Sequence, residues 1–409
     1  MMFSKMTSWL AVLAVALSGC GGGGSGGPST PPPPNPNFGG TELAHVARSG
    51  VAGTWGYTAP DGSRYALMGT AKGILVLDLR DTSNVRVVDE IDGPTNTPYP
   101  GIYWREMRVY GSHAYIVSEQ TNVRGGIMIL DLSSLPGSVR FVKSVTPRDG
   151  QLAAHTVDID TARGLLYLMR RTNLPAPGAT PAPPRLFDKP SGFGRSYTDV
   201  GDEHNAQTAA FGSIEIWDIK TDPENPRYVT TFHQNRSVHD MTAIGDYCYV
   251  AEGESSSYSV WNVSNPAAPV QVVRWSVEDG HFAHNIWPSG DGTFVVTTEE
   301  IPHGLPARVW HLNGSNAPTQ MSSFKVGTGT PHNVIMEGRM AYLSHYTEGA
   351  AVVDLSNPSA PRVVMRVDTN PVSGPEMEGC WGVYKFPGVP LMMCSDIDTG
   401  FHLIGITGS

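Results

Sequence analysis

Apolar residues along this chain gather in short runs that end at glycine, proline or asparagine. Residues 331–364 show the pattern most clearly, with apolar runs at 334–336, 341–343 and 350–354 and a further run that begins at residue 362. Strand-sized runs of apolar and β-branched residues, separated by turn formers, predict β-strands. We therefore expect three strands and the start of a fourth in this stretch.

The same unit recurs along the chain from about residue 41. In most copies a leading residue stands ten positions before an apolar or aromatic residue of the second run, as His332 does before Tyr342. The leading residues of the seven copies are Trp55, Arg105, His155, His239, His284, His332 and Trp381. Copies at a spacing of mostly about 43–53 residues, with four strands each, predict an all-β fold, a seven-bladed β-propeller, because one such unit cannot bury both of its faces alone. Aspartates such as Asp131 end most third strands, where their side chains are expected to hydrogen-bond the turn.

The seventh copy reaches the end of the sequence after its third strand. Residues 43–48 precede the first leading residue, Trp55, as the other fourth strands precede theirs. We expect this N-terminal strand to complete the last blade and close the ring, which protects the sheet edges. The propeller would then span residues 41–409. A proline-rich insertion at about 171–212 interrupts its third copy, and such a long insertion is either functional or disordered.

The first twenty residues have the character of an export signal. Lys5 precedes an apolar core at 10–17, and the segment ends with Leu-Ser-Gly before Cys20. This segment resembles the bacterial lipoprotein signal. The resemblance implies that the chain is cleaved before Cys20, that the thiol of Cys20 is lipidated, and that the lipid anchors the protein in the cell envelope, in the outer membrane. A plain secretory peptide is the alternative. Residues 21–40 are rich in glycine and then in proline, and are predicted to be a linker between the lipid and the folded domain.

Composition narrows the classes of partner. The formal net charge is −10 and the sequence lacks a run rich in lysine or arginine, which disfavours nucleic acid. None of the four cysteines forms a Cys-x-x-Cys pair, so a thiolate zinc site is not indicated. If Phe386 pairs with Leu391, Cys394 faces Val383, and a disulfide to Cys380 would need a shifted register, although an exported location permits one. Cys248 is expected to be a buried free thiol.

Several motifs together resemble the choice-of-anchor B family. They are WREMRV at 104–109, YIVSE at 115–119, the His-Asn and His-Asp leaders, and SDIDTG at 395–400. Third strands such as ILVLD at 74–78 resemble the LVIVD-type repeats of that family. The resemblance covers residues 42–409 and implies a propeller at the cell surface, here anchored through the lipid on Cys20. It implies no reaction.

The leading residues are the first candidates for chemistry. The first strand of each propeller blade lines the central channel, so these residues should form a ring at one mouth of it. Four of them are His155, His239, His284 and His332, and the second strands return toward the same mouth with Glu252, Glu299 and His345. Imidazole with carboxylate and without thiolate suits a transition-metal ion such as Zn, Cu or Fe. There is a looser parallel with other propellers whose histidine-rich channels bind copper or iron.

The competing interpretation is structural. A leader that recurs in every repeat could simply open its strand, with its ring nitrogens bonded to carbonyl groups of the neighbouring blade. The polar residues at and after the leaders are candidate ligand-binding residues, namely Arg105, Glu106, Asp240, Asn285 and Asn333. Residues 41–409 contain no G-x-S-x-G elbow, H-E-x-x-H or phosphate-binding glycine motif, so no catalytic residue is predicted.

The sequence thus predicts a monomeric binding or interaction module. Its ligand, a protein, a small molecule or a glycan, would bind on the face of the propeller. A metal-dependent enzyme or metal-binding protein that uses the histidine ring is the alternative.

Overall fold

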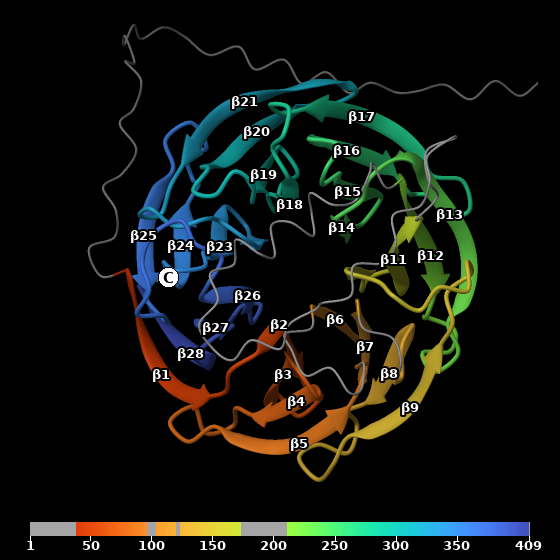
Figure 1. Cartoon of the computed structure of the whole chain (residues 1–409), viewed down its shortest axis with the longest axis vertical. Coiled ribbons are helices and arrows are strands. Elements are labelled where there is room, and N and C mark those ends of the chain that lie inside the picture. Colours follow the sequence, from red (N-terminus) through yellow and green to blue (C-terminus); the bar gives the residue numbers. More distant parts are fainter. Residues whose placement is uncertain (1–37, 96–103, 120–122, 173–210, 409) are drawn as a thin grey trace, which may run out of the picture. The chain divides into compact units, whose positions relative to one another are not determined.

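The computed structural model describes residues 38–95, 104–119, 123–172 and 211–408. In this part of the chain all regular structure is β-strand, and 28 strands form seven four-stranded antiparallel sheets. The sheets follow one another around a ring, with one strand of each sheet near the centre and one at the rim (Figure 1). The predicted all-β, seven-bladed propeller is confirmed.

The strands of the first four blades follow the chain from the inside outwards. Blade 1 contains β2 (Val51–Thr58), β3 (Arg64–Thr70), β4 (Gly73–Asp78) and β5 (Arg86–Asp92). Blade 2 contains β6 (Arg105–Tyr110), β7 (His113–Ser118), β8 (Ile127–Asp131) and β9 (Arg140–Val145). Blade 3 contains β10 (Val157–Asp160), β11 (Leu165–Thr172), β12 (Phe211–Asp218) and β13 (Arg227–Arg236). Blade 4 contains β14 (Asp240–Ile244), β15 (Tyr247–Ala251), β16 (Ser257–Asn262) and β17 (Val270–Ser276).

The last three blades follow the same order except at the closure. Blade 5 contains β18 (Ala283–Pro288), β19 (Phe294–Glu299), β20 (Ala307–Asn313) and β21 (Asn316–Phe324). Blade 6 contains β22 (Val334–Glu337), β23 (Met340–Ser344), β24 (Ala350–Asp354) and β25 (Arg362–Val367). Blade 7 contains β26 (Cys380–Lys385), β27 (Leu391–Asp396) and β28 (Gly400–Thr407), and its outer strand is β1 (Gly39–Ala47).

The cores of this fold lie between the blades, because each sheet buries both of its faces. Alternate residues of one strand belong to different cores. Tyr65 and Leu67 of β3 pack toward blade 2, whereas Ala66 and Met68 pack toward blade 7. This explains why the central strands read as continuous apolar runs instead of alternating apolar and polar residues.

The turns after the third strands repeat one device. Asp131 accepts a hydrogen bond from the backbone N–H of Ser133 at 2.9 Å, and Asp354 accepts one from the N–H of Ser356 at 2.8 Å. Asp78 and Asp218 make the same contact two residues on. The aspartates therefore stabilise turns, as expected from their positions.

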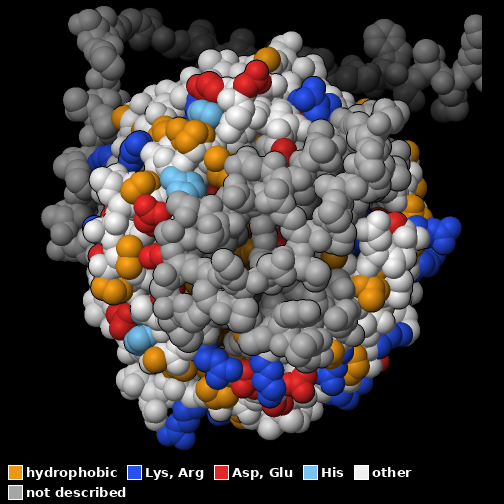
Figure 2. All heavy atoms as spheres, viewed as in Figure 1, with side chains coloured by type: hydrophobic (Ala, Val, Ile, Leu, Met, Phe, Trp, Pro, Cys, Tyr) orange, Lys and Arg blue, Asp and Glu red, His pale blue; other side chains and the backbone are white. Residues whose placement is uncertain are grey.

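The ring closes through the N-terminal strand, as predicted. β1 pairs antiparallel with β28, from Gly39 opposite Thr407 to Ala47 opposite Gly400. The two ends of the described chain thereby share one sheet (Figure 1). On the face seen in Figure 2, basic and acidic side chains lie mixed along the rim.

The hairpin that contains Cys380 and Cys394 has the predicted register, yet the two cysteines form a disulfide that this register did not favour. Val383 lies opposite Cys394, as the sequence predicts, and the N–H of Phe386 bonds to the carbonyl of Leu391. Cys380 and Cys394 are nevertheless joined by a disulfide, with Cα atoms 5.9 Å apart. The register shifts between Cys380 and Gly382, so that Cys380 lies opposite Asp396 and the disulfide joins residues that are not directly opposite each other. Cys248 is a buried free thiol, and burial raises its pKa.

Candidate metal centre at the channel mouth

Four histidines form a continuous arc where the innermost strands of blades 3 to 6 begin. The centroids of the rings of His155 and His239 are 4.5 Å apart, those of His239 and His284 4.4 Å, and those of His284 and His332 4.1 Å. The ring of Trp381, the leading residue of blade 7, continues the arc at 4.7 Å from His332. All four imidazoles are buried. The structure therefore brings together the four histidines that the repeat singled out.

One nitrogen of these rings has a structural role. The Nδ1 of His239 donates to the carbonyl of His284 in the next blade at 2.8 Å, and the Nδ1 of His332 donates to the carbonyl of Trp381. His155 Nδ1 lies 3.0 Å from a carboxylate oxygen of Glu119. In a neutral imidazole, a proton placed on Nδ1 leaves a lone pair on Nε2. In His155, His239 and His332 the structural interpretation thus accounts for Nδ1, while Nε2 keeps the character of a metal ligand.

Glu300, the residue after β19, brings a carboxylate to two of these Nε2 atoms. Its Oε2 lies 3.8 Å from His284 Nε2, and its Oε1 lies 3.7 Å from His332 Nε2. One ligand atom from each of the three buried residues lies within 4.8 Å of the other two. Burial raises the pKa of Glu300 to about 7. The hydrogen bond that the Tyr346 hydroxyl donates to Glu300 and the charge of His155 both act to lower this pKa, but they do not outweigh burial.

This donor set fits a transition-metal ion. Two imidazole nitrogens and one carboxylate oxygen are ligands that suit zinc, copper, iron or nickel. Bonds of about 2.0–2.1 Å in a tetrahedral site would place ligand atoms ~3.3 Å apart. The observed separations of 3.7 and 3.8 Å are longer than that spacing, and the three ligand atoms lie within 4.8 Å of one another, so the side chains would have to move closer together to bind an ion. Three protein ligands would also leave one coordination position for water or a substrate.

The other side chains expected at this site lie elsewhere. Glu252 accepts hydrogen bonds from His233, Arg274 and Ser257, and despite its burial these bonds lower its pKa to about 2. Glu299 is bonded to His281 at 2.6 Å and to Arg308 at 2.8 Å. Successive residues of an extended chain point to opposite sides, so Glu300 faces the histidines and Glu299 does not.

His345 also stands apart from the arc. It is buried, and burial lowers its pKa to about 4. Its Nδ1 lies close to Gly329, where an added Cβ would approach that nitrogen to 3.1 Å. The carboxylate that meets the histidines is therefore Glu300, and His345 is a neutral histidine of the protein interior.

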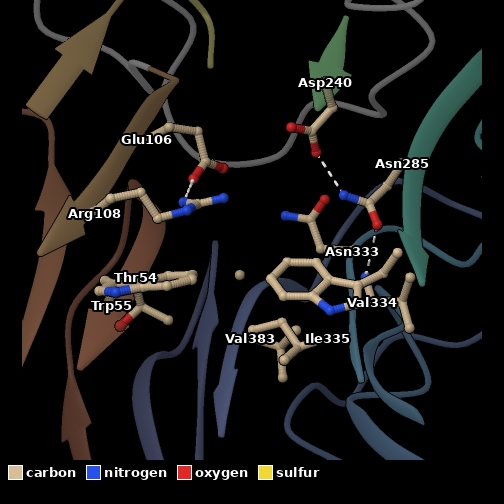
Figure 3. A pocket seen from close by; sticks show the side chains of 12 residues that line it. Thr54, Trp55, Glu106, Arg108, Asp240, Asn285, Asn333, Val334, Ile335 and Val383 are labelled. Atoms are coloured by element: carbon tan, nitrogen blue, oxygen red, sulfur yellow. Dashed lines mark hydrogen bonds and ion pairs between the residues drawn. The ribbon is translucent and has the colours of Figure 1, made fainter. Parts of the chain in front are cut away.

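A second layer of polar residues lines a small cavity of the channel (Figure 3). Glu106, Asp240, Asn285 and Asn333 all line it, as do Trp55 and Arg108. Its volume of about 20 Å³ corresponds to about one water molecule. The fifth residue expected there, Arg105, is directed away and donates to the carbonyl of Ala71 at 3.3 Å. The cavity therefore has room for one water molecule or for an ion of that size.

Arg108, which sequence reasoning did not single out, organises this layer. Its guanidinium donates to Asp158 at 2.8 Å and to Glu106 at 3.0 Å, and lies 4.0 Å above the ring of Trp55. Burial raises the pKa of both Glu106 and Asp240, and the charge of Arg108 opposes this in each case. One buried cation thus bonds carboxylates of blades 2 and 3 and ties these two blades together.

Comparison with known proteins supports the repeat architecture. The model of the LVIVD repeat matches residues 235–276 and 328–369. These segments hold the strands of blades 4 and 6 together with their leading residues, His239 and His332. In class, the protein is a seven-bladed β-propeller with a polar channel mouth. More particularly, it carries LVIVD repeats, in agreement with the resemblance seen in its sequence.

Solved structures share the fold at low sequence identity. Raptor from Chaetomium thermophilum aligns over 90% of this chain with 9% identity and a TM-score of 0.57, and this chain spans 29% of that one. U3-55K aligns over 90% of this chain and 98% of its own, with 9% identity and a TM-score of 0.57. The WD40 repeats of RRP9 align over 90% of this chain and 97% of their own, with 11% identity and a TM-score of 0.56. Such identities show the fold alone.

No curated protein matches this chain. A β-propeller built from repeats suggests a binding or interaction module. In the described residues no helix has the length and apolar character needed to span a membrane.

Proposed function

We propose that this protein is an exported, lipid-anchored β-propeller that binds a transition-metal ion at its channel mouth through His284, Glu300 and His332. The observation that carries the metal site is the meeting of two imidazoles and a carboxylate, all buried, with ligand atoms within 4.8 Å of one another. His155 and His239 extend the same arc and could supply a further ligand. Cys20 would carry the lipid and lies outside the described residues, as do residues 21–37 of the predicted linker.

The spacing of these groups favours a bound cation over direct hydrogen bonds. Separations of 3.7 and 3.8 Å between Glu300 and the two Nε2 atoms are longer than hydrogen bonds. A buried carboxylate is costly to ionise unless a positive charge lies beside it. A divalent cation between the three groups would supply that charge. Binding would release the proton of Glu300, as metal binding to protonated ligands does.

Metal titration of the detergent-solubilised full chain, purified without a histidine tag, tests the proposal. Wild-type protein is expected to bind Zn²⁺ or Co²⁺ with one ion per chain. His284→Ala, His332→Ala and Glu300→Gln should each weaken binding by about 100-fold or more, because each removes one of three ligands. Isothermal titration calorimetry measures these dissociation constants.

A matched control is available in blade 2. His113 belongs to a separate histidine–carboxylate group with Asp131 and Glu224 that is only partly buried. His113→Ala should leave the dissociation constant unchanged. The proposal fails if wild-type protein binds no metal, or if His113→Ala abolishes binding while His284→Ala preserves it.

Lipid anchoring has its own test. In cells fed an alkyne-labelled fatty acid, wild-type protein should become labelled and sediment with the membrane. Cys20→Ser should be unlabelled, because the thiol that would carry the acyl chain is then absent. Equal labelling of Cys248→Ser and wild type provides the control, and labelling of Cys20→Ser would contradict the anchor.

A further inference from the structure

Two of the three proposed ligands are held by neighbouring residues at the start of β26. The Nδ1 of His332 donates to the carbonyl of Trp381, and Ser344 Oγ donates to the same carbonyl at 2.8 Å. The hydroxyl of Tyr346 donates to Glu300, which it meets from blade 6. The backbone of Tyr346 in turn pairs with that of Cys380 in both directions, at 3.1 and 3.0 Å. His332 and Glu300 therefore both depend on the pair Cys380–Trp381.

Tyr346 has a backbone conformation that needs outside support. Its φ angle is +39°, in the left-handed region that bulky residues rarely adopt. Such a conformation persists where the surrounding contacts hold it, and it is concentrated at functional sites. The two hydrogen bonds with Cys380 are such contacts. The approach of the two segments also requires Gly379, where an added Cβ would lie 2.5 Å from the carbonyl oxygen of Tyr346.

The Tyr346 ring is fixed as firmly as its backbone. It is 1% exposed and packs in one cluster with Ala52, Met377, Trp381 and Ile397. Its ring centroid lies 4.8 Å from that of His332. The hydroxyl therefore reaches Glu300 from a side chain with little freedom to turn away, while the same ring borders the second ligand.

The disulfide secures the segment that provides these contacts. The ladder between β26 and β27 is irregular between Cys380 and Gly382, so its pairing is interrupted at Trp381. Cys380 is bonded covalently to Cys394 of β27 at this point. The covalent link holds the strand where its hydrogen-bonded pairing is interrupted, and leaves the Trp381 carbonyl directed to His332.

We propose that Tyr346 is the positioning residue for Glu300 in the metal centre, and that the Cys380–Cys394 disulfide holds Tyr346 and Trp381 in the arrangement that gives full metal affinity. This inference rests on the proposed metal-binding function and goes beyond it, since it assigns the groups that orient the ligands. Groups that orient metal ligands typically change affinity by about 10–100-fold when they are removed.

Tyr346→Phe tests the tyrosine, because it keeps the ring and its packing and removes the hydroxyl. We expect Co²⁺ binding to weaken about 10-fold or more, the visible absorption spectrum of the bound Co²⁺ to change, and the melting temperature of the metal-free protein to stay close to that of wild type. The spectrum is the decisive reading, because it reports the geometry at the metal and not the stability of the fold. His332→Ala, which removes a ligand, should weaken binding more than Tyr346→Phe.

The double variant Cys380→Ser/Cys394→Ser tests the disulfide. It should weaken Co²⁺ binding in the same direction, and adding Tyr346→Phe to it should cost less than the sum of the separate effects, since both act through one path. Cys248→Ser, which removes the buried free thiol, should bind as wild type. If the double variant does not fold, wild-type protein reduced after folding with a phosphine supplies the disulfide-free state.

The outcomes separate this inference from the function on which it rests. Failure of wild-type protein to bind metal would contradict the proposed function itself. Binding by wild type with an unchanged affinity and Co²⁺ spectrum in Tyr346→Phe overturns the positioning role and leaves the metal site standing. Unchanged affinity in the folded, disulfide-free protein overturns the part assigned to the disulfide.

Discussion

Replacing Arg108 with leucine is expected to lower the free energy of unfolding by about 3–5 kcal/mol, because removal of one partner leaves buried charges uncompensated. Arg108 is 7% exposed and bonds to Glu106 and Asp158, which are 8% and 4% exposed. Leucine fills part of the space but offers no donor. Denaturant unfolding of the two proteins at pH 7.5 measures the difference.

The loss should depend on pH in a defined direction. Burial already raises the pKa of Glu106, and Arg108 opposes that rise. Without Arg108 the folded-state pKa rises further above the unfolded value, so the folded protein holds its proton more tightly. Such a group favours folding at low pH and loses that contribution as the pH rises through its folded-state pKa. The deficit of Arg108→Leu should therefore grow from pH 5 to pH 8.

An exposed ion pair provides the control for Arg108. Arg80 bonds to Asp78 at 2.6 Å, but the Arg80 side chain is 49% exposed. Arg80→Leu should therefore change the free energy of unfolding by less than about 1 kcal/mol. If Arg108→Leu costs no more than Arg80→Leu, the described role of Arg108 as the tie between blades 2 and 3 is wrong.

Removal of the closing strand is the second change with a large expected effect. A chain that begins at residue 49 should be less stable than one that begins at residue 38 by about 2–8 kcal/mol. This follows from eight cross-strand pairs between β1 and β28, at about 0.2–1 kcal/mol each. The exposed edge of β28 should also promote association between chains. Thermal unfolding and size-exclusion chromatography measure the two effects.

Restoring the strand as a separate peptide sharpens this test. A synthetic peptide of residues 38–48 should bind the shortened chain and raise its melting temperature, because an exposed sheet edge accepts an added strand. A scrambled peptide of the same composition should not. Equal melting temperatures of the two chain lengths would show that β1 does not stabilise the ring.

The architecture could be predicted from the sequence because it repeats. Most copies place a leading residue, apolar runs and a turn aspartate at similar spacings, so each weak signal is reinforced by the others. The closing strand followed from the same count, since the last copy has three strands and residues 43–48 supply the fourth. The register of the β26–β27 hairpin was also predictable, because Pro387 to Pro390 fixes the turn.

The details of the site depend on irregularities that a single sequence does not reveal. The pairing of β18 with β19 shifts between Ala283 and Asn285, so His284 itself occupies the irregular position. Such a bulge re-aims the side chains around it. With that shift, the carboxylate facing the histidines is Glu300 and not Glu299. The disulfide likewise joins Cys380 and Cys394 although Cys394 lies opposite Val383 and Cys380 lies opposite Asp396.

The arginines of β6 show a second limit. Arg105 and Arg108 stand three positions apart on one strand, so their side chains leave it on opposite sides. The repeat drew attention to Arg105 because it is a leader, yet Arg105 bonds to Ala71 and Arg108 reaches the carboxylates. The side of the strand that faces the channel is decided by packing between blades, which the spacing of leaders does not encode.

Anomalous diffraction from crystals of the zinc-loaded full chain tests the central claim most directly. We expect a peak at the zinc edge about 2.0–2.2 Å from Nε2 of His284, Nε2 of His332 and a carboxylate oxygen of Glu300. Absence of a peak at these three residues, with zinc instead at His113, Asp131 and Glu224 or nowhere on the propeller, would contradict the proposed metal centre.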